Sequence, residues 1–223
     1  MVLDRLEAPE TISDDAYRRI RSDIIFGKLR PAQKLRLEAL KEYYGVSIST
    51  LREILCRLSS DGLVVAEGKK GFEVAPVSAN DLKELAELRL LLESHAMMAS
   101  FSRGDVEWEG RVVSAHHKLA ATERVMSSKN ANHVLWKQYD SEFHQALISN
   151  CGSRALMQAH AAVFDKYFRY LVLALSYRGE VVPRQHQQLL DYALKRDAVR
   201  AKAVLTTHIN GCVENALAAG SLH

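Results

Sequence analysis

The chain of 223 residues carries a formal net charge of +3, with 48% hydrophobic and 26% charged residues. These values are typical of a globular protein with one large or two modest domains, and they exclude a polyelectrolyte. No stretch approaches the ~20 apolar residues of a membrane span, and the acidic N-terminal segment does not resemble a signal peptide. The cysteines Cys56, Cys151 and Cys212 lack any disulfide or zinc-finger spacing. A cytoplasmic protein is therefore expected.

Residues 10–76 are predicted to form a small domain of three helices and a β-hairpin. The apolar spacing predicts one helix from after Ser13 to Phe26, a second that ends at Gly45, and a third that ends at Gly62. The hairpin has two short strands around the turn EGKKG. Three helices and a hairpin, with a short turn between the second and third helices, are typical of a winged helix-turn-helix.

Residues 77–81 are predicted to be a linker, and residues 82–220 an all-helical domain. Strand patterns vanish after Ser78, and six amphipathic stretches predict an antiparallel bundle. The expected helices span 79–101, 105–127, 131–150, 153–178, 183–195 and 197–219. The predicted fold class is mainly α, with an N-terminal winged helix-turn-helix and a C-terminal six-helix antiparallel bundle.

Positive charge is concentrated in the first domain. Between Tyr17 and Gly71, twelve Lys and Arg residues face six Asp and Glu residues. This excess of six positive charges exceeds the net charge of the whole chain. It is the distribution that contact with DNA phosphates requires.

The start of the third helix and the tip of the hairpin carry the candidate DNA contacts. Arg52 lies one turn into that helix, where an arginine can bind guanine with two hydrogen bonds. On a solvated face, Arg52 would instead pair with Glu53 or Asp61, and the hairpin lysines would form an ordinary polar turn. Their joint occurrence on one motif favours DNA contact. The candidates are Ser47, Ser49, Thr50 and Arg52 in the helix, and Gly68, Lys69, Lys70 and Gly71 in the hairpin. Ser47 or Ser49 is also expected to cap the helix.

Residues 29–78 resemble the DNA-binding domain of GntR-family transcription regulators. The shared features are a proline-led turn, the GVS turn, an R-E-x-L-x-x-L helix, the DGLV segment and a glycine-containing hairpin before valine. The resemblance implies DNA contacts by Arg36, Ser47, Ser49, Arg52 and residues 68–71. The family often has arginine directly after the GVS serine, whereas this chain has Ile48, which implies one contact fewer.

Four polar residues lie on the apolar faces of three predicted bundle helices. Asp140 and His144 are one turn apart in the third bundle helix, and His186 and His208 lie on the apolar stripes of the last two. One carboxylate and three imidazoles suit Zn²⁺, Ni²⁺ or Mn²⁺, with Zn²⁺ favoured. Singly, each is more often a buried, hydrogen-bonded side chain. A bundle that serves only as a dimerisation scaffold therefore stays open as an alternative.

Arg89 lies within the leucine stripe of the first bundle helix. An inward-facing arginine needs an anionic partner. Glu93, one turn further on, would provide a simple ion pair. A bound effector would provide the other solution, and the pattern leaves both open.

The second domain resembles the FCD-type ligand-binding domain of the FadR-like branch of GntR regulators. The segments that carry the resemblance are ELRLLLESHA, YDSEFHQAL and QHQQLLDYALKRDAVRAKAVLTTHI. A domain of six helices rather than seven is similar to the domain of the smaller, VanR-like subgroup. The resemblance implies that Asp140, His144, His186 and His208 are metal ligands and that Arg89 meets the carboxylate of an effector.

The predicted function is that of a metabolite-responsive transcription regulator, a repressor released from its operator by a small carboxylate effector at a metal site. A homodimer on a palindromic double-stranded operator is expected, with no membrane partner. The alternative is a metalloenzyme fused to a DNA-binding domain. The sequence has no HExxH or Glu-x-x-His pair for it, and Glu93 and Glu142 are the only candidate bases near the site.

Overall fold

The computed structural model describes residues 11–66, 68, 71–128, 131–174 and 178–220. They fall into two compact units, Met1–Pro76 and Val77–His223. The first combines helices with a small sheet and the second is all-helical, so the predicted fold class is confirmed. None of the helices in the described part of the chain is long and apolar enough to cross a membrane.

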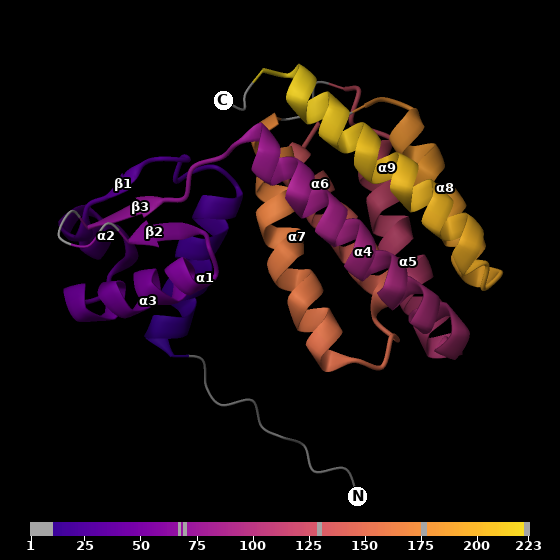
Figure 1. Ribbon diagram of the computed structural model, residues 1–223, viewed down its shortest axis with the longest axis horizontal. Coiled ribbons are helices and arrows are strands. Elements are labelled where there is room, and N and C mark those ends of the chain that lie inside the picture. The colour runs from indigo at the N-terminus through magenta and orange to yellow at the C-terminus, as the bar shows by residue number, and fades with distance from the viewer. Residues whose placement is uncertain (1–10, 67, 69–70, 129–130, 175–177, 221–223) are drawn as a thin grey trace, which may run out of the picture. The chain divides into compact units, whose positions relative to one another are not determined.

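The first unit has three helices and one antiparallel sheet of three strands in the order β1-β3-β2 (Figure 1). Its elements are α1 (Ile12–Ile25), β1 (Lys34–Leu35), α2 (Leu37–Tyr44), α3 (Ile48–Ser60), β2 (Val64–Ala66) and β3 (Phe72–Val74). The predicted hairpin corresponds to β2 and β3. The sequence did not reveal β1, because a strand of two residues is too short to show an alternating pattern.

The first helix begins earlier than predicted. The side chain of Thr11, not Ser13, caps α1 by accepting a hydrogen bond of 3.1 Å from the backbone N–H of Asp14. This bond satisfies one of the free N–H groups at the helix start. Asp14 and Asp15 then lie in the first turn, where negative charge is favourable.

The turn between α2 and α3 fixes the helix that is expected to face DNA. Gly45 ends α2 in the left-handed conformation with φ of 70°, and a Cβ placed there would meet no atom within 4 Å. Ser47 caps α3 by accepting from Thr50 N–H at 3.1 Å, which decides between the two predicted caps. Below it, the apolar face of α3 is fully buried. Its members are Leu51, Ile54, Leu55 and Leu58.

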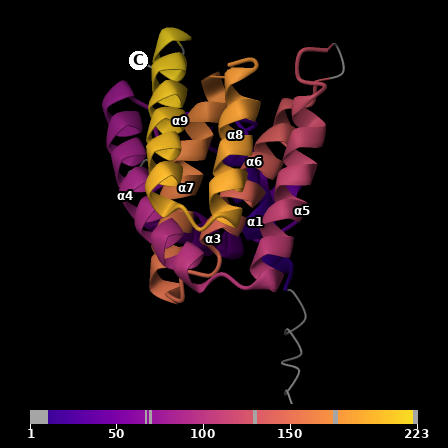
Figure 2. The same cartoon turned by 90° about the vertical axis from the view of Figure 1, so that its right-hand side faces the viewer.

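The described residues of the second unit form a bundle of six helices, each of which the sequence predicted (Figure 1, Figure 2). They are α4 (Ala79–Arg103), α5 (Val106–Glu123), α6 (His133–Ile148), α7 (Arg154–Ala174), α8 (Val181–Leu194) and α9 (Ala198–Ala218). Ser78 accepts a hydrogen bond from Asp81 N–H and caps α4, which begins at Ala79 as the predicted helix 79–101 does. Of the segment 77–81 assigned to the linker, residues 79–81 therefore belong to this helix.

The packing of the bundle places one face of every helix toward a common core. Helix α4 packs on α6, α7 and α9, while α5 packs on α6 and α8, and α8 also packs on α9. Most of this core is apolar, with Trp108, Phe143, Leu147 and Leu189 fully buried. Buried charged and imidazole side chains also lie in this interior, and they form the site described below.

Substitution of Gly45 tests the left-handed end of α2. We expect Gly45→Ala to destabilise the first unit by about 1–2 kcal/mol, because only backbone strain opposes the added Cβ. Native-state hydrogen exchange of the α3 amides should then accelerate roughly 5- to 30-fold. Gly45→Asn is the matched control and should cost less, because asparagine tolerates this conformation. Equal exchange rates for wild type and Gly45→Ala would contradict this account.

Candidate metal centre and DNA-binding surface

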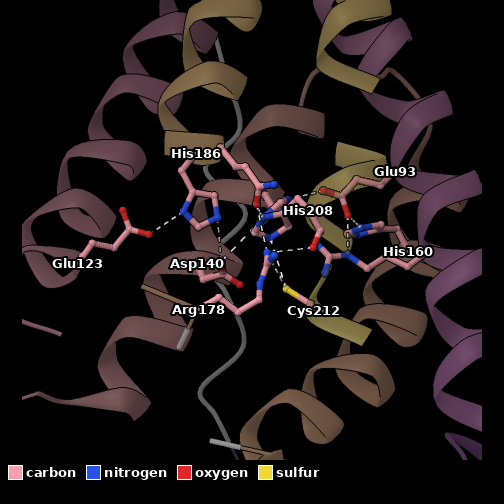
Figure 3. A network of polar contacts seen from close by, with 11 residues as sticks. Glu93, Glu123, Asp140, His160, Arg178, His186, His208 and Cys212 are labelled. Atoms are coloured by element: carbon pink, nitrogen blue, oxygen red, sulfur yellow. Dashed lines mark hydrogen bonds and ion pairs between the residues drawn. The ribbon is translucent and has the colours of Figure 1, made fainter. Parts of the chain in front are cut away.

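Four predicted side chains converge inside the bundle (Figure 3). Asp140 and His144 come from α6, His186 from α8 and His208 from α9, and all four are buried. Each residue offers one ligand atom, and these four atoms lie within 4.8 Å of one another. The three imidazole rings form a near-equilateral triangle, with centroids separated by 4.8, 5.3 and 5.7 Å.

The outer nitrogen of each imidazole is held by a partner from the surrounding helices. His144 Nδ1 lies 2.5 Å from Glu93 Oε1, and His186 Nδ1 lies 2.7 Å from Glu123 Oε1. At the third corner, His208 Nδ1 lies 3.1 Å from the side-chain oxygen of Gln185. A carboxylate or amide oxygen only accepts, so each Nδ1 donates and each Nε2 is the nitrogen left available to bind a cation.

Two of these available nitrogens are buried and have no hydrogen-bond partner. These are the Nε2 atoms of His144 and His186. Asp140 Oδ1 lies 4.0 Å from the first and 3.2 Å from the second, and the second contact is too poorly aligned for a hydrogen bond. Buried polar atoms are rarely left without partners. Their position together with a carboxylate oxygen fits a bound cation with imidazole and carboxylate ligands.

The pKa values of His186 and His208 are shifted in opposite directions although both side chains are buried. Burial opposes the charged form of His186, but Asp140 and Glu123 outweigh it and raise its pKa to about 9. For His208, burial and the neighbouring His186 and His144 hold the pKa well below its usual value. Without a metal ion, a proton therefore resides on His186 beside Asp140. A cation would replace this proton, because coordination needs the free lone pair.

Glu93 connects three helices through one carboxylate. Its Oε2 accepts from Arg89 Nε at 2.8 Å and lies 3.2 Å from His160 Nε2, while Oε1 holds His144. Burial raises the pKa of Glu93, but Arg89 and His144 outweigh burial and hold this pKa well below its usual value. The internal ion pair left open by the sequence is thus present. Arg89 Nη2 remains buried without a partner.

Several members of the site were not predicted from the sequence, namely Glu123, Gln185, His160 and Arg178. Two of them carried a signal, because each continues an apolar stripe on its helix. Glu123 follows the buried positions Val112, His116 and Leu119 on α5, and His160 precedes the buried positions Phe164, Tyr167 and Leu171 on α7. A polar residue at a stripe position indicates a buried partner.

The candidate DNA contacts in α3 gather at its first turn. The hydroxyl of Ser47 lies 2.8 Å from those of both Ser49 and Thr50, in addition to its role as helix cap. Arg52 is exposed and makes no hydrogen bond or ion pair with another described residue. The alternative pairing with Asp61 is absent, because Asp61 accepts from Tyr17 instead.

The remaining candidates lie at α2 and in the hairpin. Arg36 precedes α2, is exposed, and makes no side-chain capping hydrogen bond. Gly68 and Gly71 have positive φ values of 54° and 95°, which suit a tight glycine turn. Lys69 and Lys70 lie outside the described residues.

Both halves of the chain match known protein families. The family "Bacterial regulatory proteins, gntR family" matches residues 12–74, and the FCD domain family matches residues 84–211. The chain belongs to the GntR family. Its C-terminal bundle is an FCD domain, as the sequence resemblance implied, and the chain is a bacterial-type transcription regulator.

Named relatives of this GntR protein are also transcription regulators. It is 35% identical over 206 residues to the HTH-type regulator BphR of Paraburkholderia xenovorans, which covers 91% of this chain and 84% of BphR. It is 31% identical over 201 residues to the HTH-type repressor GlaR of Escherichia coli, covering 87% and 91%. These relatives support a regulator and not the alternative metalloenzyme.

Solved structures share the fold of this GntR protein. A GntR regulator from Rhodococcus sp. RHA1 has a TM-score of 0.76 at 21% identity, covering 92% of this chain and 97% of that one. McbR/YncC of E. coli has a TM-score of 0.77 at 17% identity, covering 93% and 98%.

The two candidate bases of the alternative metalloenzyme, Glu93 and Glu142, both interact with other side chains. Glu93 has its three partners, and Glu142 pairs with Lys118 at the surface.

Removal of the Glu93 charge should destabilise the FCD domain. We expect Glu93→Gln to cost about 3–5 kcal/mol, because it leaves the buried Arg89 without its counter-charge. Both tryptophans of the chain, Trp108 and Trp136, lie in this unit. Urea unfolding followed by tryptophan fluorescence, with a chelator present, therefore reports on it.

The matched control is Glu142→Gln. Glu142 pairs with Lys118 at 2.5 Å, but its side chain is 43% exposed. An exposed pair contributes at most about 1 kcal/mol. Equal losses for the Glu93 and Glu142 variants would contradict the central role given to Glu93.

Proposed function

We propose that this GntR regulator is a metal-containing repressor that a small carboxylate effector releases from its operator. The observation that carries the proposal is the convergence of four buried ligand atoms, among them two Nε2 atoms that make no hydrogen bond, around the Asp140 carboxylate. A purely structural bundle would gain stability by replacing such groups with apolar side chains. Three imidazoles and one carboxylate that converge on one point have a ready explanation in a divalent cation, with Zn²⁺ favoured.

The surroundings of the four ligands fit a metal centre. Ligating histidines commonly donate their second N–H to a carboxylate or carbonyl oxygen, which fixes the ring and its tautomer. Glu93, Glu123 and Gln185 occupy these three positions. Asp140, His144, His186 and His208 would hold the ion. The ion would supply a positive, oxygen-binding position for the effector.

Arg89 and Tyr167 are proposed to bind the same effector carboxylate. Arg89 Nη2 and the Tyr167 hydroxyl are both buried without hydrogen-bond partners. The two side chains lie together, since the Arg89 guanidinium carbon is 4.8 Å from the centroid of the Tyr167 ring. Both groups donate hydrogen bonds, so an oxygen-rich anion would satisfy them. Tyr167 extends the predicted effector site, which included only Arg89.

The first unit is proposed to read DNA through α3 and the hairpin. Arg52 would contact base edges, while Ser47, Ser49, Thr50 and Arg36 would contact phosphates or bases. Gly68, Lys69, Lys70 and Gly71 would contribute a wing. A homodimer would place two copies of α3 in successive major grooves, roughly 34–36 Å apart, on a palindromic operator in the cytoplasm. The relative GlaR is a repressor, which supports repression as the sign of regulation.

Helix α4 offers the connection between effector and DNA. It carries Arg89 and Glu93 and begins at Ala79, directly after the winged domain. Its start is tied to α7, because Tyr170 donates to Asp81 and accepts from Ser78 N–H. An effector that binds one arrangement of α4 and α7 more tightly would shift the population toward it.

Metal analysis tests the centre directly. Protein purified without chelators is expected to contain about one divalent ion per chain by elemental analysis. His186→Ala should lose the ion, because it removes one ligand nitrogen. His117→Ala is the control, since His117 lies exposed on α5 and should leave the metal content unchanged. Wild-type protein without metal would overturn the proposed centre.

Substitution of Arg52 tests the DNA-binding surface. With an operator selected from random DNA, Arg52→Ala should weaken specific binding by about 1–3 kcal/mol, the value of one bidentate base contact. Binding to scrambled DNA should change little. Arg52→Lys keeps the charge but loses the paired hydrogen bonds. If Arg52→Lys binds the operator as wild type does, Arg52 contacts phosphate and the base-reading role is wrong.

A further inference from the structure

A second arginine, Arg178, lies beside the proposed ligand His208, whereas Arg89 is linked through Glu93 to His144. Arg178 precedes α8, and its Nη2 lies 3.1 Å from Gln185 Oε1, 3.2 Å from the His208 carbonyl oxygen and 3.6 Å from Cys212 Sγ (Figure 3). Cys212 Sγ is in turn 4.0 Å from His208 Nε2, the nitrogen left available to bind a cation. Arg89 stands at the His144 corner of the triangle and Arg178 at the His208 corner.

The fold provides a fitted place for this guanidinium. Gly211 on α9 lies directly against it, and a Cβ at Gly211 would stand 2.1 Å from Arg178 Nη1. Any larger residue at position 211 would therefore push the guanidinium away from His208. The contacts with a backbone carbonyl and a side-chain amide orient Arg178 without neutralising its charge.

Arg178 lacks a carboxylate partner of the kind that Arg89 and Arg196 have. Among ion pairs of the described residues, Arg89 pairs with Glu93 and Arg196 with Glu109, whereas Arg178 pairs with none. Its Nε is buried and has no hydrogen-bond partner. A partly buried guanidinium with one donor unused favours binding of a further anion.

The hydrogen-bond partner of His208 is the uncharged Gln185, which leaves Arg178 without a counter-charge. Two corners of the imidazole triangle are backed by carboxylates, Glu93 and Glu123, but the third is backed by the neutral amide of Gln185. The same Gln185 oxygen lies within hydrogen-bond distance of both His208 Nδ1 and Arg178 Nη2. A glutamate at this position would orient His208 equally well. It would also form an ion pair with Arg178 and cancel its attraction for a ligand.

We propose that Arg178 determines specificity by binding the second carboxylate of a dicarboxylate effector. This inference rests on the proposed function, in which the first carboxylate binds at the metal centre beside Arg89. Because the rings of His144 and His208 are only 5.3 Å apart, we expect a short carbon chain between the two carboxylates. Gln185 and Gly211 act as positioning residues that hold Arg178 in place without supplying a counter-charge.

Calorimetric titration of the metal-containing protein tests this assignment. The probes are succinate, glutarate and adipate, each compared with the monocarboxylate of equal length, namely butyrate, pentanoate and hexanoate. At least one dicarboxylate should bind wild type about tenfold to a hundredfold more tightly than its monocarboxylate partner, the value of a charge-assisted contact. Arg178→Gln should lose this ratio and keep the weaker monocarboxylate affinity.

Gln185→Glu is the more discriminating variant, because it leaves Arg178 in place and neutralises it. It too should lose the preference, while elemental analysis shows retained metal. If Gln185→Glu loses the metal, the role of Arg178 is decided by the Arg178→Gln variant alone. Arg184→Gln is the matched control, since Arg184 is an exposed arginine on α8 and its loss should leave the ratio unchanged.

The outcomes separate this inference from the function on which it rests. A preference for dicarboxylates that persists in Arg178→Gln overturns the role of Arg178. Wild-type protein that binds monocarboxylates as tightly as dicarboxylates also overturns it, and leaves the metal-bound carboxylate site standing. If no carboxylate binds the metal-containing protein, both proposals fail.

Discussion

The bundle depends on one buried carboxylate. Removing a charge from water costs several kcal/mol unless partners compensate for it. Glu93 has three such partners, Arg89 on its own helix, His144 on α6 and His160 on α7. These contacts hold three helices in one arrangement and fix which nitrogen of His144 is left available to bind a cation. The geometry of the cluster formed by Asp140, His144, His186 and His208 therefore depends on the contacts that Glu93 makes.

A buried apolar side chain, Phe143, strengthens the charge interactions of this polar interior. The ring of Phe143 lies 5.3 to 5.9 Å from the rings of His116, His144 and His186, and its side chain is fully buried. A low local dielectric strengthens every charge interaction in such a site and makes each unpartnered group costly. Fixed charges and excluded water would thus allow a small anion to bind with useful affinity at few contact points.

Polar residues whose spacing places them on an apolar helix stripe could be predicted from the sequence. Residues that reach the site only through contacts between helices were harder to predict. Asp140, His144, His186 and His208 were found because each interrupts an apolar stripe, and the structure places all four together. Gln185 was missed, because its partner on another helix leaves no spacing in the sequence, whereas Glu123 did interrupt an apolar stripe and could have been found. The short strand β1 was missed because two residues cannot show an alternating pattern. The cap Thr11 was missed because Ser13, two residues later, is also a residue type that caps helices.

The length of α4 has a mechanical consequence. This helix is continuous over 25 residues, and Glu93 lies about 21 Å along its axis from Ala79. Because Glu93 is held firmly, it is a natural pivot. A tilt of only about 5° there would move the start of α4 by about 2 Å, a shift of the size that helices make in switching proteins. In the proposed mechanism, α4 would convert a displacement of a few tenths of an ångström near Glu93 into a larger displacement at its first residue.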